Sequence, residues 1–381
     1  MFKEVTDFIK TTFQTQDFIP LHEPRFIGKE KEYLADCIDS TYVSSVGKYV
    51  DEFEKRIRDY TGAKYAIATV NGTAALHTAL ILAGVNEGDI VITQALCFIA
   101  TSNAISYQKA IPLYIDVDKK TLGLSPEKLA EYLHENVVRK NDGYSYHKSS
   151  GKKITACVPM HTFGHPAKID EVAKICADYN IVLIEDAAES LGSTYKEKQT
   201  GLYGKIGAYS FNGNKTITCG GGGMVVTNDE VLGKRAKHIT TTAKVPHRWD
   251  FVHDEIGYNY RLPNINAALA CAQMENLDLF ISKKRELAKQ YYDFFNNKEI
   301  MFVSEPENSK SNYWLNSVLL NDRDERDKFL SYTNDNKVMT RPVWTLMNKL
   351  EMFKNCPKGN LDNSEWIEDR LVNIPSSVTN V

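Results

Sequence analysis

The chain of 381 residues carries 46 Lys and Arg against 49 Asp and Glu, a formal net charge of −3. This balance, with basic residues spread along the chain, gives no electrostatic case for nucleic acid binding. Charged residues make up 25% and hydrophobic residues 43% of the chain, which argues against wholesale disorder, and the length suggests two domains.

The seven cysteines are odd in number and widely spaced, and none forms a CxxC pair. This usage favours free thiols in a reducing compartment over a disulfide framework or a zinc site. No apolar run approaches the ~18 residues that a membrane-spanning helix needs. We therefore expect a cytoplasmic protein with no membrane partner and no bound metal.

Between residues 61 and 227, short apolar runs alternate with amphipathic segments. The pattern predicts strands over 64–70, 89–94, 111–117, 154–161 and 180–187, and helices over 73–85, 98–108 and 168–180. Such alternation is typical of a mainly parallel sheet covered by helices on both faces. Ligands bind beyond the carboxyl ends of such strands, which are here the positions after Val70, Gln94 and Glu185.

The remaining segments are less regular. The polar stretch 142–153 is predicted to be an exposed excursion. A long helix with a break fits residues 262–295, and shorter mixed segments follow it. We predict a large domain over 1–280, including an N-terminal helical segment, and a smaller domain over 281–381.

The stretch VNGTAALHTAL places a glycine turn between a strand that ends at Val70 and a helix that starts near Thr73. The free N–H groups and the positive end of the helix dipole suit a phosphate. A capped helix start, with Asn71 or Thr73 as the N-cap, explains the same residues. Taken alone, the motif favours the cap.

The stretch IVLIEDAAES brings Glu185 and Asp186 to the end of an apolar strand, with Glu189 about one turn further on. A carboxylate buried there is costly unless it has a partner. A protonated ring nitrogen is a suitable partner. A helix cap, or an ion pair with an arginine, is an equal alternative.

Lys215 lies in AYSFNGNK, and four glycines, Gly220–Gly223, follow it. The glycines of a P-loop precede the lysine, and a predicted strand rather than a helix follows these four, so neither glycine-rich nucleotide motif fits. A surface lysine on a turn is the default interpretation. The small and aromatic neighbours favour instead a desolvated lysine whose lowered pKa makes it nucleophilic. The glycines would allow a tight turn and a close approach to a neighbouring element.

A phosphate site, a buried carboxylate and a shielded lysine together are what a pyridoxal phosphate site requires. The lysine would bond to the cofactor, the carboxylate would keep the pyridine nitrogen protonated, and the helix terminus would hold the phosphate.

The segments VNGTAAL, EDAAES, SFNGNK…GGGGM and GYNYRLPNINAAL, in this order, resemble the DegT/DnrJ/EryC1/StrS sugar aminotransferases, which are fold-type-I pyridoxal phosphate enzymes. The resemblance spans nearly the whole chain. It implies an α/β large domain with a mostly parallel seven-stranded sheet flanked by helices, and a smaller α+β C-terminal domain. Further segments, among them STYVSSVGKYVDEFE and VPMHTFGHP, resemble the nucleotide-linked sugar 4-aminotransferases of the legionaminic acid route.

The resemblance also implies roles for single residues. Lys215 is the catalytic lysine that moves the proton, and Asp186 is the partner of the pyridine nitrogen. Glu189 stands where many relatives have a Gln or His that contacts the 3′-oxygen of the cofactor. Phe98 would stack on the cofactor ring, although without the resemblance a core aromatic is the better explanation.

The phosphate would be held by backbone groups and the Ser210 hydroxyl, with help from a second subunit. The implied backbone contacts are Gly72, Thr73 and Ala74. Asn259 would reach the phosphate of the neighbouring subunit, which implies a homodimer with shared active sites.

Two histidine-containing stretches need separate interpretation. His161 and His165 have the i, i+4 spacing of a metal-binding pair on a helix, but Gly164 and Pro166 argue against a helix there. By resemblance, His161 borders the substrate instead.

The stretch 244–253 reads as a solvated, turn-rich loop. The resemblance places it near an active-site mouth, where Lys244, His247 and Arg248 would meet the nucleotide diphosphate of a substrate held by the partner subunit.

The implied reaction is a transamination in two halves. L-Glutamate gives its amino group to the cofactor, which becomes pyridoxamine phosphate, and the amine then passes to C4 of a nucleotide-linked 4-keto-6-deoxy sugar. A UDP- or GDP-linked 2-acetamido-2,6-dideoxy-hexos-4-ulose is expected, on a route to legionaminic acid or another surface glycan.

Three alternatives have to be weighed against this reaction. Dehydratases of the same fold replace the lysine by histidine, so Lys215 favours transamination. A non-catalytic regulator with this fold could lose Lys215 or Asp186, and both are present. A phosphotransferase would need the opposite order of glycines and lysine.

Overall fold

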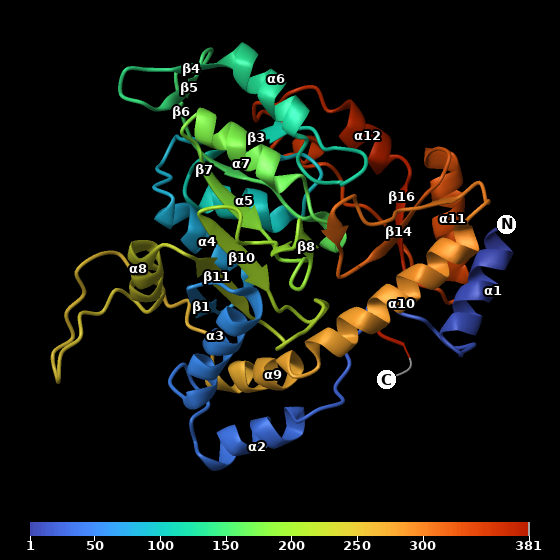
Figure 1. Cartoon of the computed structure of the whole chain (residues 1–381), viewed down its shortest axis with the longest axis horizontal. Helices are drawn as coiled ribbons and strands as arrows, with labels where there is room; N and C mark the ends of the chain where they lie inside the picture. Colours follow the sequence, from blue (N-terminus) through green and yellow to red (C-terminus); the bar gives the residue numbers. More distant parts are fainter. Residues whose placement is uncertain (380–381) are drawn as a thin grey trace.

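A nine-stranded sheet forms the centre of the fold in the computed structural model, which describes residues 1–379 (Figure 1). Its main path has the order β1 (Tyr65–Thr69), β11 (Gly223–Thr227), β10 (Ile206–Ser210), β7 (Val182–Asp186), β6 (Lys153–Val158), β2 (Ile90–Gln94) and β3 (Ile111–Ile115). Neighbours from β10 to β3 are parallel, whereas β11 is antiparallel to both of its neighbours. The prediction of a mostly parallel sheet is thereby confirmed; its main path has the predicted seven strands, and β4 and β5 bring the total to nine.

Helices cover both faces of this sheet (Figure 1). One face carries α4 (Gly72–Leu82), α5 (Ile99–Tyr107) and α8 (Glu230–Thr240), and the other carries α3 (Lys48–Thr61), α6 (Pro126–Asn136), α7 (Ile169–Asp178) and α9 (Asn264–Met274). Successive side chains of a strand point to opposite faces. In β2, accordingly, Val91 joins one core cluster, and Ile90 and Ile92 join the other.

The predicted excursion over 142–153 contains the second strand of a hairpin that the sequence did not reveal. It is formed by β4 (Val137–Arg139) and β5 (Ser145–His147), and β5 pairs with β6 at its start. The predicted strand 154–161 also ends early, at Val158. The next residue is Pro159, which has no N–H for a sheet ladder.

A second, antiparallel sheet lies at the other end of the molecule. It has the order β12 (Met301–Phe302), β14 (Asn316–Leu319), β16 (Leu371–Ile374) and β15 (Arg341–Pro342), with α11 (Arg323–Asp335) packed against it. The long helix α10 (Leu277–Phe295) runs from the region of α9 to this sheet (Figure 1). The predicted break in the 262–295 helix therefore falls between Met274 and Leu277.

The first helix, α1 (Phe2–Thr12), packs with the C-terminal elements and not with the large sheet. Val5 and Ile9 share a core cluster with Tyr291 of α10, Phe329 of α11 and Val372 of β16. We therefore propose that α1 belongs to the smaller unit, unlike the predicted division, which placed it in the large domain.

The other elements are peripheral to these two sheets. They are α2 (Glu30–Asp39), α12 (Asp362–Glu368), two short 3-10 turns (Thr162–Gly164 and Met347–Lys349) and a small sheet of β8 (Thr194–Tyr195), β9 (Lys198–Gln199) and β13 (Ser309–Lys310). Within the described residues, no helix has both the length and the apolar character to cross a membrane.

Candidate active site

A cavity of about 320 Å³ opens at the carboxyl edge of the central sheet. Its walls come from the start of α4, the start of α5, the ends of β7 and β10, and two tryptophans from the C-terminal part of the chain. The predicted site residues that line it are Gly72, Thr73, Phe98, Asp186, Glu189, Ser210 and Lys215.

The N-terminus of α4 is both capped and open to an anion. The Asn71 side chain accepts a hydrogen bond from the Ala74 N–H at 2.8 Å, so the predicted cap is present. This bond occupies the Ala74 N–H in the cofactor-free chain, and the contact of Ala74 with a phosphate stays a prediction. In residues 1–379 no acceptor is found for the N–H groups of Gly72 and Thr73, and these groups suit a phosphate.

The glycines after Lys215 bring a strand start close to this helix terminus. Gly220 has φ +80°, a left-handed conformation that permits the turn. Gly223 begins β11 between Thr69 and Ser210, and a Cβ there would lie 2.3 Å from the Asn71 carbonyl oxygen. The run therefore allows a turn and a close approach, as the sequence predicted.

Gly72 is needed for the contact between α4 and Ser210. A Cβ at this position would lie 2.8 Å from the Ser210 Cβ and 3.0 Å from its Oγ. We expect Gly72→Ala to displace Ser210 from the helix terminus at a cost of about 1–3 kcal/mol. The dissociation constant of Gly72→Ala for pyridoxal phosphate should rise about tenfold or more.

A spectroscopic titration of cofactor-free protein measures that constant. Gly213→Ala is the matched control, because a Cβ at Gly213 meets no atom of residues 1–379 within 4 Å. An unchanged constant in Gly72→Ala would show that this contact does not shape the site.

The two carboxylates at the end of β7 have different surroundings. Glu185 accepts from the N–H groups of Gly201 at 2.8 Å and Gly204 at 2.5 Å, and from His161 Nε2 at 3.0 Å. His161 Nδ1 accepts from the Ala167 N–H at 3.1 Å, so the ring proton lies on Nε2. Glu185 therefore has a structural role, because it holds the Gly201–Gly204 turn and the His161 ring in place.

This arrangement corrects the expectation that His161 borders the substrate. Its side chain is fully buried, and both ring nitrogens are bonded to protein groups. His165 is also buried, with its ring edge-on to Tyr313, and the turn between the two histidines is a 3-10 turn rather than an α-helix.

Asp186 is held by two hydrogen bonds. Its Oδ2 accepts from Thr101 Oγ1 at 2.6 Å, and its Oδ1 accepts from the Ala188 N–H at 3.2 Å. Burial raises the pKa of the Asp186 carboxyl above its ordinary value, and these two bonds oppose that rise. A nearby cation would stabilise the carboxylate further.

Thr101 is a site residue that the sequence analysis missed. It lies three positions after Phe98, so that the start of α5 supplies both the aromatic ring and the hydrogen bond to Asp186. The FxxT spacing, which puts both side chains on one helix face, is the signal that was available. Phe98 itself is 45% exposed and lines the cavity. Its ring packs edge-on against that of Trp344, with 5.8 Å between the ring centroids.

The Lys215 amine is shielded, as predicted. Its Nζ lies 3.3 Å from Glu189 Oε1 and 3.9 Å from the centroid of the Trp314 ring, and 12% of the side chain is exposed. The Trp314 Nε1 donates to the Asn214 carbonyl at 2.6 Å. Trp314 and Trp344 come from far along the chain, and the sequence analysis assigned neither to the site.

Glu189 is buried beside the lysine, and its second oxygen is also engaged. Oε2 accepts from the Phe163 N–H at 2.9 Å, and Phe163 holds a left-handed backbone at φ 58°. Burial raises the pKa of Glu189 from 4.5 to about 7, against the lowering effect of Lys215. Glu189 therefore shares a proton readily near neutral pH.

This raised pKa predicts a pH dependence of stability in the cofactor-free protein. Because the folded-state pKa lies above the ordinary value, the contribution of Glu189 is complete below pH 4.5 and is lost as the pH rises through about 7. The loss is roughly 3 kcal/mol, since one pH unit corresponds to about 1.36 kcal/mol. Glu189→Gln should remove this loss.

Denaturant unfolding at several pH values measures the effect. Glu171→Gln, at an exposed position on α7, serves as the control and should keep the wild-type profile. A wild-type profile in Glu189→Gln would contradict the prediction.

The four remaining predicted residues lie outside the cavity of their own chain. Asn259, Lys244, His247 and Arg248 belong to the hairpin between α8 and α9, which projects away from the sheet (Figure 1). Lys244 lies over the Phe251 ring, and His247 lies 3.3 Å from an Asp250 carboxylate oxygen. Their predicted roles in a second subunit stay predictions.

Comparison with known proteins gives a consistent result. GDP-perosamine synthase of Escherichia coli O157:H7 is 38% identical over 361 residues, which are 94% of this chain and 93% of that protein. The putative pyridoxal phosphate-dependent aminotransferase EpsN of Bacillus subtilis (strain 168) is 36% identical over 336 residues, 88% and 84% of the two chains. The crystal structure of the aminotransferase TlmJ from Streptoalloteichus hindustanus is similar in fold, with a TM-score of 0.85, 22% identity, and coverage of 94% and 93%.

The predicted family, enzyme class and cofactor class are confirmed by these relatives. They do not show that the chain is closest to the legionaminic acid branch. The model of the DegT/DnrJ/EryC1/StrS aminotransferase family matches residues 25–379. The chain therefore belongs to the DegT/DnrJ/EryC1/StrS aminotransferase family.

Proposed function

We propose that this chain transfers an amino group from L-glutamate to C4 of a nucleotide-linked 4-keto-6-deoxy sugar, with pyridoxal phosphate as its cofactor. The observation that carries the proposal is the shared cavity of the Lys215 amine, the buried Asp186 carboxylate and the open N-terminus of α4. These are three groups that this cofactor requires, and they come from separate parts of the chain.

The residues present fit pyridoxal phosphate at both of its ends. The N–H groups of Gly72 and Thr73 and the Ser210 hydroxyl would hold the phosphate, in the space that Gly72 leaves open. Asp186 would keep a proton on the pyridine nitrogen, because its buried carboxylate is stabilised by a cation. When bound, the cofactor supplies a ring that withdraws electrons from the substrate carbon.

Lys215 moves the proton in this proposal. Its Nζ is the amine in the cavity, and Glu189 lies within 3.3 Å to accept or return a proton near neutral pH. Trp314 covers the lysine and Phe98 lines the same cavity, so that both exclude water around the reacting groups.

The identity of the nucleotide is supported by the relatives. The Escherichia coli protein is named for a GDP-linked amino sugar, and so is the 33%-identical protein of Vibrio cholerae. We propose on this ground that a GDP-linked keto sugar is preferred to a UDP-linked one.

We also propose a homodimer in which each subunit completes the other's site. The projecting hairpin exposes Trp249, Phe251 and Ile256 by 67%, 80% and 82%. Large exposed apolar side chains of this kind mark interaction surfaces. Asn259 and Lys244 lie on the same hairpin and would reach the partner's cavity.

The test offers purified protein GDP- and UDP-linked 4-keto-6-deoxy sugars with glutamate and follows the sugar product by mass spectrometry. We expect an amino sugar nucleotide and 2-oxoglutarate in equal amounts, with a higher kcat/KM for the GDP-linked sugar. A preference for the UDP-linked sugar would overturn the assignment of the nucleotide, and no amine transfer to either sugar would overturn the proposed substrate class.

A further inference from the structure

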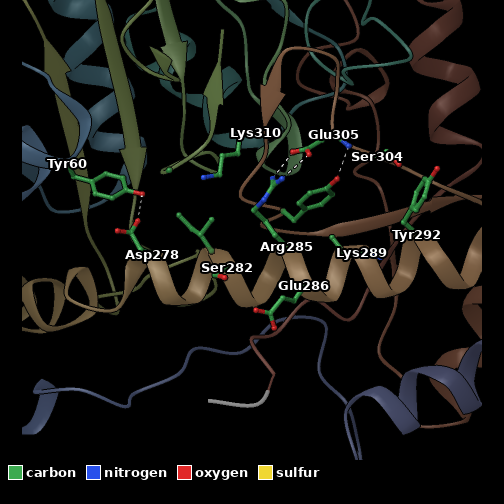
Figure 2. Close-up of a pocket in the computed structure, with 14 residues that line it drawn as sticks. Tyr60, Asp278, Ser282, Arg285, Glu286, Lys289, Tyr292, Ser304, Glu305 and Lys310 are labelled. Atoms are coloured by element: carbon green, nitrogen blue, oxygen red, sulfur yellow. Dashed lines mark hydrogen bonds and ion pairs between the residues drawn. The ribbon is translucent and has the colours of Figure 1, made fainter. Parts of the chain in front are cut away.

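Helix α10 carries two adjacent cationic residues, Lys284 and Arg285, that both bond to the segment 311–314. Figure 2 shows Arg285 projecting from α10 towards Glu305, in a groove of about 800 Å³ that is separate from the cofactor cavity. Neither residue lines the cofactor cavity, and the proposed reaction uses neither of them.

Lys284 is fully buried and bonds only to main-chain carbonyls among the described residues. Its Nζ donates to the carbonyl oxygens of Trp314 at 3.1 Å and Ser376 at 2.6 Å. No carboxylate of residues 1–379 forms an ion pair with it. An amine buried without a counter-ion is costly, and burial lowers its pKa to about 7. The two bonds to main-chain carbonyls offset part of this cost, and they tie α10 to Trp314 and Ser376.

Arg285 holds the start of the same segment. Its guanidinium makes two bonds to Glu305, at 2.7 and 2.9 Å, and Nη1 also donates to the Ser311 carbonyl at 2.7 Å. Glu305 in turn accepts from the Ser311 N–H at 2.8 Å. A bidentate pair of this kind fixes geometry as well as adding energy.

The segment between these two anchors contacts both Lys215 and the stretch of chain that carries its partner Glu189. Asn312 Nδ2 donates to the carbonyl oxygens of Glu189 and Leu191, each at 2.9 Å. Two residues later, the Trp314 ring lies 3.9 Å from Lys215 Nζ. The chain of contacts thus runs from α10 through 311–314 to Glu189 and Lys215.

We propose that Lys284 and Arg285 are positioning residues for Lys215, which hold the segment 311–314 so that the Trp314 ring stays against the lysine amine. The inference rests on the proposed function of Lys215 for its catalytic meaning, but the contact itself exists without cofactor. Loss of either anchor lets Trp314 withdraw and exposes the amine to water.

The first experiment uses the tryptophan fluorescence of cofactor-free protein. The difference between wild type and Trp314→Phe defines the Trp314 signal. Lys284→Met and Arg285→Met should each shift this signal towards that of a solvated indole. Lys289→Met is the matched control, since Lys289 lies on the same helix, has a 74% exposed side chain and, among the described residues, pairs only with Asp293.

The second experiment measures how fast added pyridoxal phosphate is captured on Lys215 by borohydride reduction. We expect the rate to fall roughly tenfold to a hundredfold in both variants, because a misplacement of about 1 Å can cost roughly 10²-fold. The control should keep the wild-type rate.

The outcomes separate positioning from mere stabilisation. Folded variants with a lower midpoint of thermal unfolding, but with the wild-type Trp314 signal and capture rate, overturn the inference. If Lys284→Met does not fold, the partly exposed Arg285 decides the question alone. If wild type captures no cofactor, the proposed function fails, while the Trp314 signal still tests the link from α10.

Discussion

Lys215→Ala is expected to lower kcat at least about 10³-fold. In the proposed function, the variant loses the amine that would bond to the cofactor and move the proton, and a positioned acid–base group alone contributes roughly 10²–10⁴-fold. Turnover of glutamate and the nucleotide-linked keto sugar is measured directly. Since the Lys215 side chain is largely buried, thermal unfolding is recorded as well to verify that the variant is folded.

Lys205→Ala provides the control for this prediction. Lys205 is an exposed lysine just before β10, on the same stretch of chain as Lys215. It should retain wild-type turnover. A Lys215→Ala enzyme that keeps more than about a tenth of wild-type kcat would be incompatible with the assigned role.

Asp186→Asn should lower kcat by roughly 10²–10³-fold, the usual effect of removing one preorganised electrostatic contact. The amide has nearly the size of the carboxylate but no charge, so it cannot hold a proton on the pyridine nitrogen. Steady-state kinetics give kcat, and titration with pyridoxal phosphate shows whether the cofactor is still bound.

Thr101→Val tests how the orientation of the Asp186 carboxylate matters, without changing its charge. It removes the 2.6 Å hydrogen bond to Asp186 Oδ2 and leaves the charge in place. A hydrogen bond to a charged group contributes about 1.5–3 kcal/mol, so the loss in kcat should be smaller than that of Asp186→Asn. Equal activity of Asp186→Asn and wild type would exclude a role for the charge.

The large sheet could be predicted because its strands are short apolar runs between turns. Strand β7 is found within two residues, and helix α4 within three residues, of the ranges expected from the sequence. The smaller sheet could not be predicted in this way. Its strands β12 and β15 have two residues each, and their pairing depends on β14 and β16, whose partners are distant in sequence.

The residues of the cavity also differ in how far the sequence predicts their positions. Lys215, Asp186 and Gly72 follow directly from strand ends and helix starts, so their motifs brought them to the correct sheet edge. Trp314 is placed against the lysine by contacts with α10 and Asn214 that are distant in sequence, and no local pattern encodes them. The buried environment of His161 likewise depends on Glu185, which lies on a separate element, β7.

The role of Glu189 illustrates what the structure adds. The EDAAES motif gives its position, and a carboxylate beside a phenolic oxygen is unfavourable unless one of the two carries a shared proton. The structure buries Glu189 against Lys215 and the Phe163 N–H, and its pKa of about 7 allows it to share a proton there. A carboxylate at position 189 is thereby compatible with the site.

The most direct test of the central claim is to reduce the holoenzyme with borohydride and locate the fixed cofactor by peptide mass spectrometry. The account predicts one pyridoxyl group per chain, on Lys215. Attachment to another lysine, such as Lys244 or Lys284, or no attachment at all, would contradict it.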